Sequence, residues 1–310
     1  MEKEFVLIDP FENKLHTYLY TTSSKKPKGI VQIIHGKGEH LSRYKNFALF
    51  LNEQGYHVIG NDHLGHGKTA ETLEYVYFDD TMGFHKLYEG VKTVRDYITE
   101  KYPKLPVIMF AHSMGSFIGR YTIINDPKRY DLAIFSGTGY FARWKIKIAQ
   151  AVSSFIIKRK GPKYISPFLN KLADKPIKSM RKNGLINLRK EWISHDKEIQ
   201  NYVENSEMCG MPFTASAHRD IFNMIYEMMD KAKITASASS MPIFFISGEE
   251  DALGDYGEGV KKLYNLYYKA GYTNMKYIIF ENCRHEVINE KDNERVYNSI
   301  LKWIEKNRNL

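Results

Sequence analysis

The sequence has few cysteines, no long apolar segment and no internal repeat. Its two cysteines, Cys209 and Cys283, cannot build a disulfide framework, and such sparse usage is typical of a reducing compartment. The longest mostly apolar stretches, such as Met241–Ile246, have the length of single strands, so no transmembrane helix is expected. The first residues also lack the basic and then apolar order of a signal peptide. We therefore expect a soluble, cytoplasmic protein.

The composition is that of an ordinary globular protein. Of the 310 residues, 43% are hydrophobic and 26% are charged, which excludes a disordered chain, a collagen-like repeat and a small disulfide scaffold. The length suits either two domains or a single α/β domain with an insertion. The 45 Lys and Arg exceed the 36 Asp and Glu and leave a net charge of +9. This excess raises the question of a nucleic acid, a membrane surface or an anionic substrate as the partner.

Strand and helix patterns alternate along most of the chain. Two short stretches, Phe5–Ile8 and Leu15–Tyr20, predict an opening hairpin. Further strands are predicted at Ile30–Ile34, Tyr56–Gly60, Val107–Phe110, Leu132–Phe135, Ile243–Ser247 and Met275–Phe280, with helices at Tyr44–Gln54, Leu87–Tyr102, Met114–Ile124, Gly259–Ala270 and Asn293–Asn307. Strands that alternate with helices in this way indicate an α/β fold with a mostly parallel sheet and helices on both of its faces.

The alternation stops between residues 140 and 238, where strand signals disappear and helical patterns dominate. This stretch lies between two predicted strands of the sheet, so it is interpreted as an inserted helical cap, or lid. We expect an α/β core domain made of residues 1–139 and 239–310, with residues 140–238 forming the cap.

A serine stands at a sharp junction between a predicted strand and a predicted helix. The apolar strand Val107–Phe110 runs to Ser113, and a helix opens directly after it. The small residues Ala111 and Gly115 let the strand and the helix approach closely, which is typical of a nucleophilic serine. The helix N-terminus and the backbone N–H of Met114 would stabilise a developing oxyanion. A buried serine that caps a helix is the alternative, and the strand before the serine argues against it.

A nucleophilic serine needs a base, and the base needs an acid that orients it. In this architecture the chain order is serine, acid, histidine, each after its own strand. The late strand Ile243–Ser247 is followed by four candidate acids: Glu249, Glu250, Asp251 and Asp255. The last strand is followed by His285, the final histidine of the chain. A lone loop histidine is otherwise an exposed polar residue, but its place after the last strand favours the role of base.

A second oxyanion donor is expected in the loop after an early strand. There, Gly36 and Gly38 flank Lys37, whose backbone N–H is the predicted donor. A phosphate loop is excluded because no P-loop or dinucleotide-binding pattern fits this stretch. The nearby His63 and His66 suggest a metal, but no set of cysteines or carboxylates completes a ligand group. They are interpreted as polar loop residues at the sheet edge, and neither a metal nor another cofactor is expected.

Several segments of the chain together resemble one known family. These are the α/β-hydrolases that include monoacylglycerol lipases and lysophospholipases, related to the S33 aminopeptidase-like hydrolases. The matching segments span nearly the whole sequence: His35–Tyr44, Asn61–Gly67, His112–Gly115, Ser247–Asp251, Gly254–Val260 and Arg284–Glu286. Each segment alone is unspecific, but the combination is highly specific. The resemblance implies the α/β-hydrolase fold with an inserted helical cap.

The resemblance also implies a role for each candidate residue. Ser113 would be the nucleophile, His285 the base, and Asp251 the orienting acid among the four candidates. The backbone N–H groups of Lys37 and Met114 would form the oxyanion hole. Lys37 departs from the small residue that is common at its position, which brings a cation near the substrate. The resemblance is weaker in the cap, so cap residues that would line the substrate are not assigned.

These features predict a serine carboxyl-ester hydrolase that acts through an acyl-enzyme. The expected substrate is a small lipid ester with one acyl chain, such as a monoacylglycerol or a lysophospholipid, held in an apolar slot beneath the cap. One alternative is a peptidase or amidase with the same triad, which would need an acidic pocket for a substrate amine. Another is a catalytically silent binding protein on this fold, which the intact serine, acid and histidine argue against.

The positive charge is concentrated in the cap. Residues 141–190 contain fourteen Lys and Arg and one acid, so this segment carries +13 and the rest of the chain −4. Apolar residues recur there at helical spacing ahead of the basic run Lys158–Lys160: Trp144, Ile148, Val152, Phe155 and Ile156. A basic helix with an apolar face is typical of a segment in peripheral contact with an anionic membrane. The same face could instead cover the active site, and both can hold. A nucleic acid is not expected, since no binding module accompanies the charge.

Overall fold

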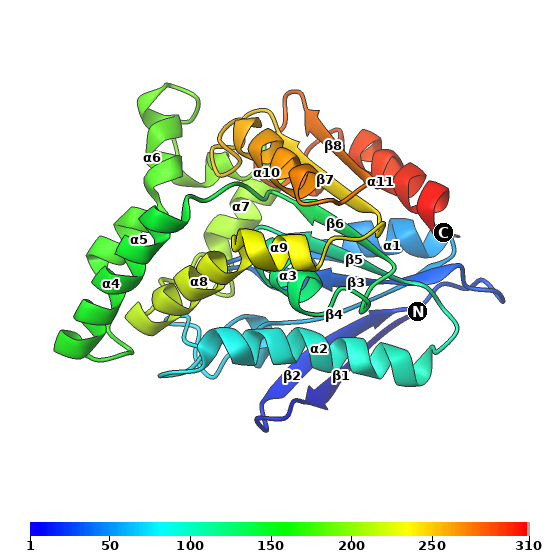
Figure 1. Cartoon of the computed structure of the whole chain (residues 1–310), viewed down its shortest axis with the longest axis horizontal. Helices are drawn as coiled ribbons and strands as arrows, with labels where there is room; N and C mark the ends of the chain where they lie inside the picture. Colours follow the sequence, from blue (N-terminus) through cyan, green and yellow to red (C-terminus); the bar gives the residue numbers. More distant parts are fainter. Residues whose placement is uncertain (309–310) are drawn as a thin grey trace.

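The computed structural model describes residues 1–308, which contain a single eight-stranded sheet (Figure 1). The strand order is β1-β2-β4-β3-β5-β6-β7-β8, with β1 and β2 forming the predicted hairpin at one edge. Strands β3 to β8 run parallel, so the predicted mostly parallel sheet is confirmed. The strands are β1 Glu2–Ile8, β2 Lys14–Tyr20, β3 Gly29–Ile34, β4 Tyr56–Asn61, β5 Val107–His112, β6 Leu132–Ser136, β7 Ile243–Gly248 and β8 Met275–Phe280.

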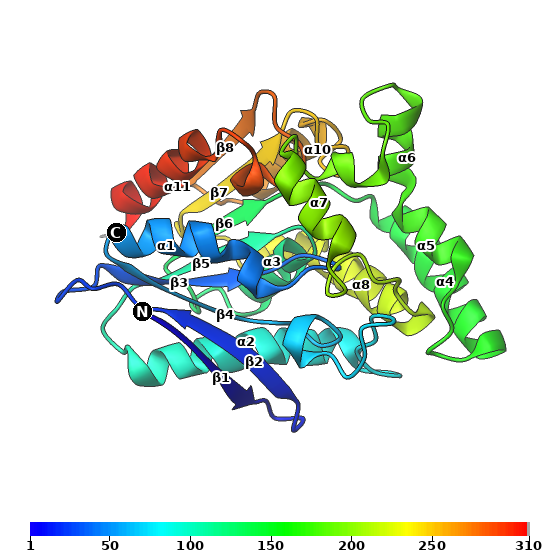
Figure 2. The same cartoon turned by 180° about the vertical axis from the view of Figure 1, so that it is seen from behind.

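Helices cover both faces of the sheet, as the alternating pattern predicts. Helices α1 (Lys45–Glu53) and α11 (Asn293–Asn307) pack on one face, in front in Figure 2. Helices α2 (Gly83–Lys101), α3 (Met114–Asn125) and α10 (Glu258–Lys269) pack on the other, in front in Figure 1. Each face therefore has its own apolar core, and the continuous apolar sequence of the central strands matches their burial on both sides.

The segment between β6 and β7 contains helices and no strand within the described residues. These are α4 Arg143–Lys160, α5 Pro167–Ala173, α6 Lys175–Lys182, α7 Lys197–Asn205, α8 Ala215–Met228 and α9 Lys231–Ala236. Helices α4, α5 and α6 lie at one end of the molecule, far from both chain termini (Figure 1). Helix α8 packs on α4 and also on α2 and α3 of the core. The division into core and cap at residues 140 and 238 stays a prediction.

Short 3-10 turns lie beside several of these elements. They are η1 Leu41–Tyr44, η2 Gly67–Thr69, η3 Arg189–Trp192 and η4 Val287–Asn289. Helix α2 begins four residues before its predicted start, because the Asp79 carboxylate accepts the backbone N–H groups of Thr81 and Met82 and orders the turn ahead of it. Among residues 1–308, no helix has both the length and the apolar character needed to cross a membrane.

Candidate active site

The predicted serine occupies a strained turn between β5 and α3. Ser113 has φ 51° and ψ −118°, a conformation that non-glycine residues rarely adopt. Its N–H donates to the carbonyl of Ser136 on the neighbouring strand at 2.9 Å, which fixes the turn. A β-carbon on Gly115 would lie 2.1 Å from the carbonyl oxygen of Ile34, so only glycine fits there. The predicted close approach at residue 115 is confirmed, and the serine lies at the N-terminus of α3.

A histidine and a carboxylate meet at the ends of β7 and β8. The Nδ1 of His285 lies 3.0 Å from Oδ2 of Asp251, and both side chains are buried. Two further groups hold this carboxylate: the backbone N–H of Leu253 donates to Oδ1 at 2.9 Å, and the Ser247 hydroxyl donates to Oδ2 at 3.1 Å. The carboxylate is therefore fixed from three sides and can orient the imidazole.

Electrostatics couple these two groups. Burial favours the neutral form of Asp251, but the charge and hydrogen bond of His285 outweigh it and lower the pKa of the Asp251 carboxyl. Burial likewise opposes protonation of His285, but the carboxylate beside it raises the pKa of the imidazole above its ordinary value. The pair is thus arranged to stabilise a positive charge on the histidine.

The other three acids of this turn lie elsewhere. Glu249 is exposed, Asp255 forms an ion pair with Lys262 at 3.3 Å, and Glu250 accepts from Nε of Arg284 at 3.2 Å. The sequence alone left all four acids open because they share one loop. The structure brings one of them, the acid that the family resemblance singles out, into contact with the histidine.

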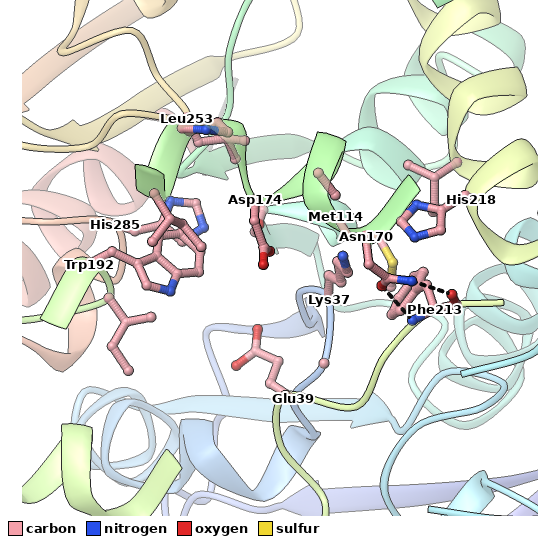
Figure 3. A pocket seen from close by; sticks show the side chains of 18 of the residues that line it. Lys37, Glu39, Met114, Asn170, Asp174, Trp192, Phe213, His218, Leu253 and His285 are labelled. Carbon is pink, nitrogen blue, oxygen red and sulfur yellow. Dashed lines mark hydrogen bonds between the residues drawn. The ribbon is translucent and has the colours of Figure 1, made fainter. Parts of the chain in front are cut away.

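The ring of His285 lines the candidate serine's cavity. Nε2 of His285 is buried and has no hydrogen-bond partner among residues 1–308. The ring stacks on the indole of Trp192, with centroids 4.6 Å apart and planes at 28° (Figure 3). A β-carbon on Gly137 would lie 2.8 Å from Cε1 of the histidine, so a glycine is needed on that side. Both Ser113 and His285 line the same cavity.

The predicted oxyanion loop, residues 35–38, is held by hydrogen bonds from several directions. The N–H of Gly38 donates to Nε2 of His66 at 3.1 Å, and its carbonyl accepts from Gly210 of the inserted segment at 2.8 Å. Gly38 has φ 64°, which confirms the expected need for glycine. Gly36 is required for another reason, since a β-carbon there would lie 2.5 Å from Oε1 of Glu39, which is held by Arg43 and Tyr44. The loop therefore carries Lys37 to the edge of the serine's cavity.

The cavity has a volume of about 630 Å³ and lies between the carboxyl ends of the strands and the inserted helices. Its wall is largely apolar, with contributions from α3, α4 and α8: Phe117, Ile146, Ile221, Phe222 and Ile225. Polar groups are fewer and cluster near Lys37, whose ammonium lies 4.5 Å from the ring centre of Phe213 (Figure 3). The five predicted site residues Lys37, Ser113, Met114, Asp251 and His285 thus gather at one place; all but the buried Asp251 line the cavity.

Comparison with known proteins agrees with this geometry. The family model described as serine aminopeptidase, S33, matches residues 25–292, well over half of the sequence. The chain belongs to this family.

Two relatives and one solved structure match nearly the full length of this S33 family member. A protein of monkeypox virus named "Monoglyceride lipase homolog" is 26% identical over 285 residues, 90% of this chain and 88% of the relative. A "Monoacylglycerol lipase" of Mycolicibacterium smegmatis is 24% identical over 285 residues, 91% of this chain and 90% of the relative. The structure of a thermostable carboxyl esterase from Bacillus coagulans, in complex with glycerol, has a TM-score of 0.86 and 26% identity, covering 99% and 98% of the two chains. The predicted α/β-hydrolase fold is confirmed, and the protein is a hydrolase related to lipases and esterases.

A buried ionic cluster supports the site of this S33 protein, and the sequence analysis missed it. Arg43 donates to Glu39 at 2.7 Å and, through both terminal nitrogens, to Glu286 at 2.9 and 2.6 Å. Burial alone would raise the pKa of Glu286, but the charge of Arg43 lowers it to about 2. Glu39 also accepts the N–H of Gly36, so the cluster joins the oxyanion loop to the residue after His285. Glu39 and Arg43 stand four residues apart in a recognised motif, which was the available signal.

The histidines of this region are structural supports. His35, His63 and His66 are fully buried, and burial lowers the pKa of His63 to about 3 and of His66 to about 4. Nε2 of His35 accepts the N–H of His63 at 2.9 Å, and Nδ1 of His66 lies 2.9 Å from the carbonyl of Leu64. Within residues 1–308, no group of three or more metal-ligating side chains converges. The sequence predicts that His63 and His66 are polar loop residues at the sheet edge. They follow the end of β4 and are buried, and Nε2 of His66 accepts the N–H of Gly38 in the predicted oxyanion loop.

Proposed function

We propose that this hydrolase cleaves carboxyl esters by way of an acyl-enzyme, with Ser113 as nucleophile, His285 as general base and Asp251 as the acid that orients it. The observation that carries the proposal is the position of Ser113, strained at the N-terminus of α3 and lining the same cavity as the His285 ring whose Nδ1 contacts Asp251. Backbone strain of this kind persists where function demands it.

The chemistry of the first half-reaction follows from these contacts. The hydroxyl oxygen of Ser113 attacks the ester carbonyl while Nε2 of His285 takes its proton. The carboxylate on Nδ1 stabilises the imidazolium that forms. Negative charge develops on the carbonyl oxygen, which would accept from the backbone N–H groups of Met114 and Lys37. Collapse of the tetrahedral species transfers the proton from Nε2 to the departing alcohol and leaves the acyl group on the serine.

The second half-reaction repeats these steps with water. The neutral imidazole deprotonates a water molecule, which attacks the acyl carbonyl, and the serine recovers its proton from Nε2 as the carboxylic acid leaves. The distance between the serine and Nε2 tightens when a substrate is bound, since catalytic hydrogen bonds are commonly long in the free enzyme.

The substrate that fits the cavity best is an ester with one acyl chain. A volume of about 630 Å³ with a largely apolar wall accommodates one chain and its head group. Two relatives that match nearly the full length are named for monoglyceride or monoacylglycerol lipase activity. We therefore propose a monoacylglycerol or a lysophospholipid as the substrate class.

A peptidase or amidase remains the second candidate because the family model is described as a serine aminopeptidase. An aminopeptidase needs a carboxylate that receives the substrate's amine. Three acids line the cavity: Glu39 and Glu286 are both bound to Arg43, and the third, Asp174, is not free either. That pairing favours an ester over a free amine.

One experiment tests the mechanism. The wild type and Ser113→Ala are incubated with a fluorophosphonate probe and with p-nitrophenyl esters of increasing chain length, alongside the matching anilides. We expect labelling and turnover to be lost in Ser113→Ala, by a factor of about 10⁴ or more in turnover, because the residual activity comes only from binding and the oxyanion hole. Ser299→Ala on α11 serves as the control and should behave as the wild type.

Undiminished labelling of Ser113→Ala would overturn the mechanism. The dependence of turnover on ester chain length measures the length of the acyl slot. Faster cleavage of the anilides than of the esters would show that the protein is an amidase and not an esterase.

The basic cap adds a proposed partner, the surface of an anionic membrane. In α4, Trp144, Ile148 and Phe155 are 64%, 57% and 60% exposed, and none of them lines the cavity as described. Exposed lysines and arginines lie on the same helix and on its neighbours: Lys145, Lys147, Lys158, Arg159, Lys160, Lys171, Lys175, Lys178, Arg181 and Lys182. Apolar side chains surrounded by cations suit the interface of an acidic bilayer.

Vesicle co-sedimentation tests this partner. We expect binding to vesicles with anionic lipid, weakening as salt rises, and a several-fold loss in Trp144→Ala. Tyr268→Ala on α10 is the matched control, because Tyr268 is also an aromatic residue with 64% exposure. Binding that ignores lipid charge and salt would exclude the electrostatic contact.

A further inference from the structure

One segment of the inserted region, residues 191–195, lies directly on the loop that follows β8. The N–H of Glu286 donates to the carbonyl of Ile193 at 2.7 Å, and the hydroxyl of Ser194 donates to the carbonyl of Asn289 at 2.8 Å. The same segment places Trp192 against the ring of His285. This part of the insertion therefore borders His285, and its residues Trp192 and Ile193 also line the cavity.

The segment ends in a histidine that contacts two carboxylates at once. Nδ1 of His195 lies 3.2 Å from Oε1 of Glu290, and its Nε2 lies 3.2 Å from Oε2 of Glu250. The ring is about a third exposed, and it is not among the residues that line the cavity. Its contacts are thus with the two glutamates and not with a substrate.

Both glutamates act as acceptors. Glu290 accepts the backbone N–H of Arg284 on Oε1 at 2.8 Å and that of His195 on Oε2 at 2.9 Å, while the Ser194 hydroxyl also donates to Oε2. Glu250 accepts from the Arg284 guanidinium at 3.2 Å. A neutral imidazole has one N–H and one lone pair, so it would direct that lone pair at one carboxylate. The contact of Nδ1 with Glu290 has the geometry of a hydrogen bond, and Nε2 lies at ion-pair distance from Glu250, so an imidazolium is attracted to both carboxylates.

The charges around the ring agree with a cation there. The two glutamates and Arg284 sum to one negative charge, which a protonated His195 balances. On its own segment, Glu191 is paired with Lys197 at 3.1 Å, and the carboxylate of Asp196 accepts the first N–H groups of α7.

Each glutamate belongs to a loop that carries one member of the predicted triad. Glu250 directly precedes Asp251, and Glu290 holds the N–H of Arg284, the residue before His285. A cation between the two glutamates ties these loops together. It thereby fixes the 3.0 Å contact between Asp251 and His285.

We propose that His195, as an imidazolium supplied by the insertion, is a positioning residue that clamps Glu250 to Glu290 and so aligns the acid and the base of the site. The proposal rests on the proposed function for its kinetic consequence, whereas the charge state of His195 does not depend on any activity.

The kinetic test uses His195→Gln and His195→Arg with a short soluble p-nitrophenyl ester. Glutamine carries no charge and cannot bridge both carboxylates, so we expect kcat to fall about threefold to tenfold, the scale of two partly exposed ion pairs. The KM should stay within about a factor of two, because the ring does not line the cavity. Arginine keeps the cation and should restore most of kcat. His85→Gln, an exposed histidine on α2, is the control and should be unchanged.

A second measurement does not depend on turnover. The ¹⁵N shifts of the His195 ring in the full chain, assigned with His195→Gln, should be those of an imidazolium at the pH where kcat is measured. A neutral ring would overturn the clamp, and so would equal kcat in all three proteins or a defect in KM alone. Absence of any ester hydrolysis together with an imidazolium signal would instead refute the proposed function and leave the clamp intact.

Discussion

Helices α3 and α4 both border the cavity, yet they differ sharply in burial. Ten of the twelve residues of α3 are buried, including a charged one, Arg120. Only two of the eighteen residues of α4 are buried, Ala149 and Ser153. The first helix is held on all sides by the sheet and its neighbours, whereas the second rests on α8 and turns most of its surface outward.

The difference separates two tasks. The helix that begins at Ser113 is fixed by packing, and a shift of about an ångström would misalign the hydroxyl that we propose as the nucleophile. Helix α4 contributes Ile146 to the cavity wall and packs on α8, and only its exposed face is open to an outside partner. Substitutions in the two regions should therefore produce effects of different kind and size.

The largest effect is expected on the buried side, at the acid. Asp251→Asn should lower kcat by about 10⁴, because the amide favours the wrong tautomer of the histidine. It should also move the acid limb of the pH–rate profile. In the wild type the carboxylate holds the pKa of His285 above its ordinary value, so activity rises with pH as the imidazole loses its proton in that higher range. Without the negative charge the limb should shift to lower pH.

A pH–rate series with a soluble ester measures both effects in Asp251→Asn. Glu249→Gln, at an exposed acid of the same turn, is the control. A rate within tenfold of the wild type, or an unmoved acid limb, would contradict the assigned pair.

A matched pair of isoleucines measures the contrast between the helices directly. Ile118 in α3 is completely buried, and Ile148 in α4 is 57% exposed. Ile118→Ala should lower the free energy of unfolding by about 2–5 kcal/mol, through lost burial and the cavity left behind. Ile148→Ala should change it by no more than about 0.5 kcal/mol. Urea unfolding gives both values, and equal losses would mean that the outer face of α4 is packed in solution.

The smallest effect concerns the strain stored at the serine. Residue 113 has a positive φ, which glycine tolerates and alanine does not. Ser113→Gly should therefore be more stable than Ser113→Ala by about 1 kcal/mol, although both are inactive. Thermal and urea unfolding of the two variants make the comparison. A less stable glycine variant would show that the turn is not strained.

Much of the sheet and of the helices packed on it could be predicted from the sequence. Continuous apolar strands and helices of regular period identify a two-sided parallel sheet, and such a sheet gathers its loops at one edge. That is why Ser113 and His285 could be paired although they are distant in the chain. The local sequence also predicts the turn at Ser113, since the small residues 111 and 115 allow β5 and α3 to approach closely.

The remainder depends on contacts that no local pattern contains. Four acids share one loop, and which of them reaches the histidine depends on the backbone turn at Gly248–Leu253. The cluster of Glu39, Arg43 and Glu286 joins residues more than 240 positions apart. The proposed clamp at His195 likewise depends on how the insertion packs on the loops that carry Glu250 and Glu290. Charge counts revealed that the cap is basic, but not which face of α4 is open.

Strands β6 and β7 are neighbours in the sheet, yet 106 residues lie between Ser136 and Ile243. Pairing these two strands closes a loop that contains the whole insertion. The free-energy cost of the entropy lost in such a closure rises by only about 0.6 kcal/mol for each doubling of loop length. Lengthening the insertion at one of its exposed loops should therefore change the folding free energy of the sheet very little. A transplanted insertion must reproduce three contacts with the core: the packing of α8 on α2 and α3, the hydrogen bond from the Gly210 N–H to the Gly38 carbonyl, and the short segment beside His285. New substrate preferences could be installed on this core by altering the remaining helices.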